Sequence, residues 1–212
     1  MFEEVVIADP EEVSSEISQL RLDHEKLIEV VRYADSEGAL CTRNDPKGYR
    51  LITVNAKAAR GLREQFCGDE WVHDEFGNQP GILNESLGLR IIPCNFDENA
   101  GNPLLTPTNW TEKGTASGRK VRCNGTGWLP GLESPVIEGE DEIVTLVLGI
   151  YSQDGEPLSA ELSYPIEFSG NKYKKFSKRM MILNSDSDIG SPIDDSDMGG
   201  PTEIVEIDVK RK

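Results

Sequence analysis

Residues 142–168 read EIVTLVLGIYSQDGEPLSAELSYPIEF. From position 158 to 168 apolar and polar side chains alternate, which is the period of a strand with one buried face. Residues 143–148 are almost continuously apolar, which indicates a central strand. Residues 153–156, QDGE, separate the two runs and contain the turn-forming Asp-Gly pair. The stretch therefore predicts a β-hairpin whose first strand lies inside a sheet.

Other segments are predicted from shorter patterns. Residues 178–183 are expected to extend the same sheet, and residues 87–93 form a strand-like island among Gly, Pro and Asn residues. Residues 49–54 contain Tyr, Ile, Thr and Val, which favour a strand. Residues 114–127 are rich in glycine and are predicted to form a loop.

A long helix is predicted at residues 11–34. Asp9 is placed to cap it, Pro10 suits the first helical position, and Gly38 is a plausible stop. A second helix is predicted at residues 56–66. Apolar or semi-polar side chains of the first helix recur in alternating steps of four and three, at Val13, Ile17, Leu20, His24, Leu27, Val31 and Ala34. We expect this seam to pack on its own domain, and an oligomerising coiled coil is the alternative.

These elements predict an α+β fold, with two N-terminal helices packed on a mainly antiparallel β-sheet within a single domain at residues 1–183. Residues 184–202 have the Asp, Ser, Gly and Pro composition of an acidic flexible linker. Residues 203–212 are predicted as a C-terminal strand or tail. Its apolar side chains alternate at Val205, Ile207 and Val209. We expect this strand to close the chain's own sheet, and addition to a partner's sheet is the alternative.

The chain has 22 basic and 38 acidic residues and a net charge of −16. This charge disfavours generic binding to nucleic acid or to an anionic membrane. Three basic islands, at residues 41–60, 101–130 and 169–183, lie between four acidic stretches. The islands either neutralise the acidic stretches across the fold or form faces of opposite sign.

A cytoplasmic location is expected. The sequence shows neither a basic-then-apolar leader nor an apolar run near the ~20 residues that span a bilayer. Cys41, Cys67, Cys94 and Cys123 form no close pair, which suits isolated thiols in a reducing compartment.

Two basic clusters are candidate interaction surfaces. The denser one comprises Lys172, Lys174, Lys175, Lys178 and Arg179. Its bases are interleaved with Tyr173 and Phe176, and they are expected to bind a polyanion or to dock the acidic segment that follows. The second comprises Lys113, Arg119, Lys120 and Arg122. It lies between two tryptophans, so it suits phosphate and base contacts, and a hairpin paired with acidic segments is the alternative.

Catalytic and metal-binding signals are weak. The chain has two histidines, and His24 falls on the apolar seam, where a structural role is expected. His73, Asp74 and Glu75 are weak metal candidates, because their spacing matches neither zinc nor EF-hand sites. We expect no catalytic residue and no cofactor.

The pattern is typical of a non-enzymatic acidic binding or regulatory protein that acts in a macromolecular complex, through a protein partner or self-association. The expected contacts are the helix seam at Ile17, Leu20, Leu27 and Val31, the basic cluster at 172–179 and the C-terminal strand. One alternative is a DNA-mimic inhibitor of a nucleic-acid-binding enzyme. Another is a nucleic-acid-processing enzyme, or its subunit, that uses the basic loops 113–122 and 172–179.

Overall fold

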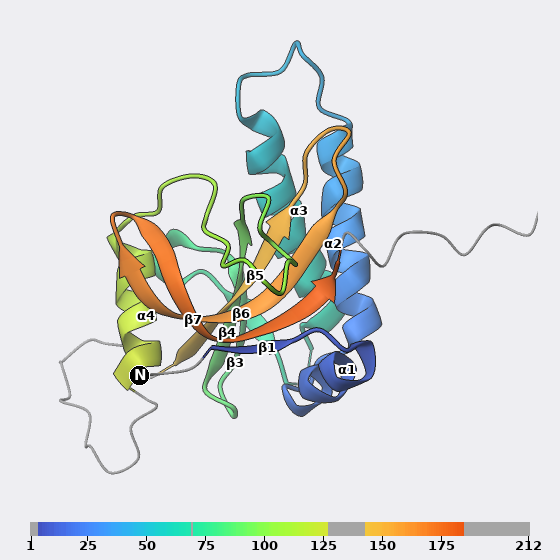
Figure 1. Cartoon of the computed structure of the whole chain (residues 1–212). Helices are drawn as coiled ribbons and strands as arrows, with labels where there is room; N and C mark the ends of the chain where they lie inside the picture. The colour runs from blue at the N-terminus through green and yellow to red at the C-terminus, as the bar shows by residue number, and fades with distance from the viewer. Residues whose placement is uncertain (1–3, 69, 127–142, 185–212) are drawn as a thin grey trace, which may run out of the picture.

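The described residues form an α+β fold built on one seven-stranded sheet (Figure 1). The computed structural model describes residues 4–68, 70–126 and 143–184. The strands lie in the order β1-β7-β6-β5-β4-β3-β2. Their bounds are β1 Val5–Ile7, β2 Val72–Asp74, β3 Gly81–Asn84, β4 Leu89–Asn95, β5 Val144–Tyr151, β6 Ser159–Ser169 and β7 Lys172–Leu183.

The predicted hairpin is confirmed. β5 and β6 pair antiparallel, with Leu148 opposite Leu162, and β5 lies in the middle of the strand order. Gly155 has the positive φ of 77° that the connecting turn requires. The expectation of a mainly antiparallel sheet is wrong, because β4 pairs parallel with β5 and β1 pairs parallel with β7. The sheet is mixed.

The predicted first helix is two helices, α1 (Pro10–Gln19) and α2 (His24–Ala39). Asp9 caps α1 as expected, accepting hydrogen bonds from the backbone N–H groups of Glu11 and Glu12 at 3.1 and 3.0 Å. The chain then turns at Arg21, whose φ is 58°, and Asp23 caps α2 by accepting from the Lys26 N–H at 3.0 Å. A second cap within the apolar seam thus divides the helix.

The strand predicted at residues 49–54 is wrong, because these residues begin helix α3 (Tyr49–Phe66). Gly48, in the left-handed conformation at φ 83°, precedes its first turn. Val54 is buried with Ala58 and Leu62 at helical spacing, so tertiary packing overrides the strand preference of the β-branched residues. α3 packs closely on α2, where a Cβ on Gly38 would lie 2.6 Å from Val54 Cγ2.

The loop predicted at residues 114–127 is wrong as well. Residues Thr115–Thr126 form helix α4, which packs on β6 and β5. The Asn124 side chain holds it there: its Nδ2 donates to the carbonyls of Thr145 and Pro165 at 2.7 and 2.8 Å, and its Oδ1 accepts from the Thr145 N–H at 2.7 Å. The helices are therefore not all N-terminal.

The helices cover opposite faces of the sheet (Figure 1). α1, α2 and α3 pack on one face, where Leu146 and Leu148 of β5 join the main core. α4 and part of the connection between β4 and α4 cover the other face, where Val147 packs with Tyr173 and Phe176. β5 is buried on both sides, as predicted for a central strand.

The face of β6 that was expected to be buried is buried at Ala160 and Leu162. The opposite face is buried as well, at Ser159, Glu161 and Ser163. Glu161 accepts from the Gly101 N–H at 3.0 Å, because the β4–α4 connection lies over this face. None of the helices in the described ranges has the length and apolar character needed to cross a bilayer. The predicted linker from residue 185 and the predicted strand at 203–212 lie outside the described residues.

Candidate anion-binding cavity

Most bases of the dense cluster on β7, here called the basic strand (Lys172, Lys174, Lys175, Lys178 and Arg179), contact acceptors of the chain itself. Arg179 is 1% exposed and pairs with Glu161, which is 0% exposed. Lys178 pairs with Glu16, and Lys175 pairs with Glu167 at 2.8 Å on the surface. Lys174 is exposed and has no ion pair within the described ranges.

The second predicted cluster is dispersed. Arg119 and Arg122 lie exposed on α4. Lys120 is buried, donates to the Phe76 carbonyl at 2.8 Å and lies over the Phe76 ring. Lys113 precedes the helix and is half-buried. The structure therefore does not gather these four bases into the expected loop.

The helix seam serves the chain's own core. Ile17, Leu27 and Val31 are fully buried there, and Leu20 packs against it. His24 Nε2 lies 3.3 Å from the Ile182 carbonyl. The three buried side chains therefore have no exposed surface with which to contact a partner, contrary to the interaction role expected for the seam. Val205, Ile207 and Val209 lie outside the described residues.

The weak metal candidates point apart. His73 is exposed on β2, whereas Asp74 is buried and accepts from Arg90 Nε at 2.6 Å. Glu75 accepts from Arg63 Nη2 at 3.1 Å. Within the part of the chain that the structure describes, no three His, Cys, Asp or Glu side chains are grouped as a metal site would require.

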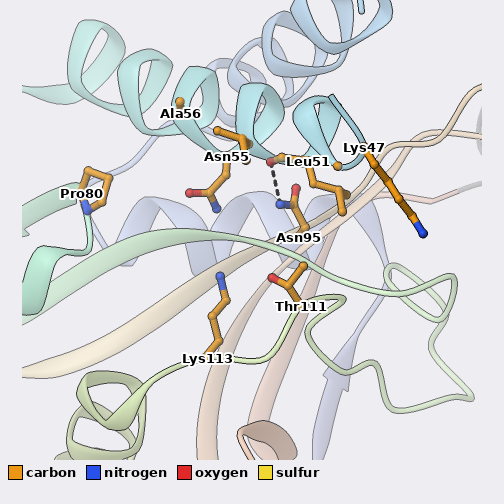
Figure 2. Close-up of a pocket in the computed structure, with 10 residues that line it drawn as sticks. Lys47, Leu51, Asn55, Ala56, Pro80, Asn95, Thr111 and Lys113 are labelled. Carbon is orange, nitrogen blue, oxygen red and sulfur yellow. Dashed lines mark hydrogen bonds between the residues drawn. The ribbon is translucent and has the colours of Figure 1, made fainter. Parts of the chain in front are cut away.

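A cavity of about 460 Å³ lies between α3, the end of β4 and the segment that precedes α4 (Figure 2). Its volume is in the range of small-ligand sites. Its apolar wall comprises Leu51, Ile52, Ala56 and Pro80. Its polar groups come from Lys47, Asn55, Asn95, Thr111 and Lys113.

The cavity lies where β4 extends past the end of its neighbour β3. The pairing of β3 with β4 ends at Ile91, whereas β4 continues to Asn95. Asn55 Nδ2 donates to the Pro93 carbonyl at 3.0 Å, and Asn95 Nδ2 donates to the Leu51 carbonyl at 2.8 Å. The two amides therefore join α3 to this strand end, and both are fixed in orientation.

The basic strand holds in place the segment that forms the other wall. Lys172 donates through Nζ to the carbonyls of Asn109 and Trp110. The Asn109 side chain accepts from the Tyr173 N–H at 2.8 Å and donates to the Asn171 carbonyl at 3.0 Å. The Lys113 N–H donates to the same Asn171 carbonyl at 3.0 Å. Residues 109–113, here called the anchored segment, thus hold Lys113 at the cavity.

The charge of the cavity differs from that of the whole chain. None of the described lining residues is acidic, and across the described ranges neither Lys47 nor Lys113 has an ion-pair partner. Figure 2 shows the Lys113 ammonium pointing toward β4, whereas Lys47 extends outward. Burial raises the pKa of the Cys94 thiol, and the adjacent Lys113 ammonium partly opposes this rise.

This lining is suited to binding. The described lining residues include no histidine, aspartate or glutamate, the residue types that most often accept a proton in catalysis. It offers two ammonium groups, a hydroxyl and two amide oxygens. Of these residues the sequence indicated only Lys113, as a polyanion contact. Asn55 and Asn95 carried no signal, because their role depends on the edge of β4.

Comparison of this chain with protein-family models, with curated proteins and with solved structures finds no match. Its candidate site is therefore defined by the geometry of the cavity alone.

Proposed function

We propose that the protein is a non-enzymatic binding protein that acts within a macromolecular complex and holds an anionic group of its partner in the cavity. The observation that supports this is Lys113, a half-buried residue whose cavity has apolar and amide groups and no acidic residue in its described lining. An anion from outside the chain would supply the opposite charge that this lining lacks, and opposite charges attract.

The long-range charge restricts which anion fits. A net charge of −16 repels a nucleic acid or another polyanion. Screening limits this repulsion to about 8 Å at physiological ionic strength, so a single carboxylate or phosphate close to Lys113 is attracted by the nearest charges. The cavity is thus suited to one or two charges rather than to a charged polymer.

The basic strand supports this choice of surface. Three of its five bases pair with Glu16, Glu161 and Glu167, and Lys172 donates to backbone carbonyls, so most of its donors already have acceptors within the chain. The alternative of a nucleic-acid-processing enzyme required these bases to face a nucleic acid. We therefore favour recognition at the cavity.

An NMR titration with isovalerate, a branched aliphatic carboxylate, tests the proposed function. In the full chain, isovalerate should shift the amide resonances of Asn55, Asn95 and Thr111 in a saturable manner. Lys113→Met should weaken binding at least about tenfold, as expected for loss of a charged hydrogen bond. Lys174→Met removes the same charge from an exposed site and should leave binding unchanged. Equal loss in both variants, or no shift at the cavity, would contradict the proposal.

A further inference from the structure

The hydrogen-bonding groups of the cavity specify more than an anion. Because Asn55 and Asn95 donate through Nδ2 to Pro93 and Leu51, each amide has its oxygen left to accept. Across the described ranges, no hydrogen bond reaches either Oδ1. Figure 2 shows the Asn55 oxygen on the Pro80 side of its amide group. A matching ligand therefore carries an N–H or O–H donor as well as a negative charge.

The apolar wall adds a third requirement. Leu51, Ile52 and Ala56 lie on α3, and Ile52 is 65% exposed at the cavity. Burying a ligand's aliphatic group against them removes apolar surface from water, which favours binding. The ligand thus combines a carboxylate, a donor and an aliphatic group within a short distance.

A free amino acid satisfies these requirements poorly. Its α-ammonium group would lie among the positive charges of Lys113 and Lys47, and like charges repel. An acylated α-amino acid has no such charge. Its α-carbon carries a carboxylate, an amide N–H and a side chain, and this is the chemistry of the last residue of a polypeptide.

We propose that the cavity binds the C-terminal residue of a partner polypeptide. The α-carboxylate contacts the Lys113 ammonium, the terminal amide N–H donates to Asn55 Oδ1, and an aliphatic side chain packs on Leu51 and Ile52. Exposed Lys47 lies at the mouth, where the preceding residues of the polypeptide leave the cavity. Capture of a terminal carboxylate is a known mode of peptide recognition. This inference rests on the proposed function, because it assumes that the cavity binds an anion.

The test compares matched small probes on the full chain by NMR titration. N-acetyl-L-leucine should bind at least about fivefold more tightly than isovalerate, because it adds an N–H donor. N-acetyl-L-leucinamide, which lacks the charge, should bind at least about tenfold more weakly than the acid. The ester analogue 2-acetoxy-4-methylpentanoate keeps the carboxylate and lacks the N–H. Its affinity should be about fivefold lower than that of N-acetyl-L-leucine.

A pentapeptide extends the test from a small molecule to a polypeptide. Acetyl-Gly-Ser-Gly-Ser-Leu with a free carboxylate should compete with N-acetyl-L-leucine, and its C-terminal amide should not. Lys113→Met should abolish the difference between the two peptides, whereas Lys174→Met should preserve it.

The outcomes separate the two proposals. If isovalerate binds as well as N-acetyl-L-leucine, or if the free and amidated peptides compete equally, the C-terminal inference is overturned and anion binding stands. If isovalerate does not bind at the cavity, both proposals are wrong.

Discussion

The basic strand and the cavity hold positive charge in opposite ways. On β7, Arg179 is buried against Glu161 and Lys178 pairs with Glu16. At the cavity, Lys113 has no acidic neighbour among the described lining residues. The denser cluster in the sequence is therefore the one whose charge is mostly used within the fold. The density of basic residues in the sequence did not locate the candidate site. It was located by asking which basic side chains have acidic partners in the structure.

The two regions are also connected. Lys172 of the basic strand holds the anchored segment, and that segment places Lys113. One basic region thus anchors the segment that lines the other. The following changes separate the structural role of the first from the binding role of the second.

The largest expected effect is on stability and comes from Glu161→Gln. This change leaves the Arg179 guanidinium buried without its counter-charge, which costs about 3–5 kcal/mol for a buried pair. Glu167→Gln, on the same strand, removes the acid of the exposed pair with Lys175 and should cost no more than about 1 kcal/mol. Urea denaturation measures both. Similar losses of stability would contradict this expectation, because the buried Arg179–Glu161 pair would then stabilise the fold no more than the exposed Lys175–Glu167 pair does.

Asn109→Ala should have the next largest effect. It removes the side-chain bonds to Tyr173 and Asn171 and leaves the buried Tyr173 N–H unpaired, whereas the Asn171 carbonyl keeps the Lys113 N–H. The expected cost is about 1–3 kcal/mol. Isovalerate binding should also weaken, because the anchored segment would no longer hold Lys113 in place. Asn99→Ala, in the same connection, is the control and should preserve both properties. Unchanged binding in Asn109→Ala would show that the anchored segment does not position Lys113.

Lys113→Met should alter binding and not folding. Isovalerate affinity should fall at least about tenfold, while the free energy of unfolding stays within about 0.5 kcal/mol of the parent value. Calorimetric titration and urea denaturation check the two parts. A large loss of stability would indicate that Lys113 holds the fold together rather than a ligand.

Glu4→Gln gives the smallest expected change and a dependence on pH. Burial raises the pKa of Glu4, so its ionised form destabilises the folded state. The variant should be more stable than the parent at neutral pH. The difference should shrink as pH falls through the raised pKa and vanish below the ordinary value of 4.5, where both states are protonated. A variant less stable at neutral pH would contradict this, because the attraction between Glu4 and Arg179 would then outweigh the cost of burying the Glu4 carboxylate.

The central hairpin was predictable because its signal is local. Alternating apolar residues and an Asp-Gly turn specify strands without reference to the rest of the chain. The α1 cap was predictable for the same reason. Residues 49–54 were not, because their β-branched side chains favour a strand and only packing against α2 makes them helical. α4 contains two glycines, and its burial against β6 decided its conformation.

The site was less predictable than the fold. Lys113 was recognised as a base, but its cluster with Arg119, Lys120 and Arg122 is dispersed by α4. Asn55 and Asn95 are distant in sequence and meet only where β4 extends past β3. A site built on a strand edge and fixed by amide-to-carbonyl bonds leaves no spacing pattern in the sequence.

The most direct test of anion binding at the cavity observes the lysine ammonium groups themselves by NMR. In the ¹⁵N-lysine-labelled full chain, the Nζ resonances can be followed during titration with isovalerate. We predict a saturable shift of Lys113, a smaller one of Lys47, and none at Lys172, Lys174 or Lys178. A shift at the lysines of β7 with Lys113 unchanged would contradict the claim that the available positive charge lies at the cavity.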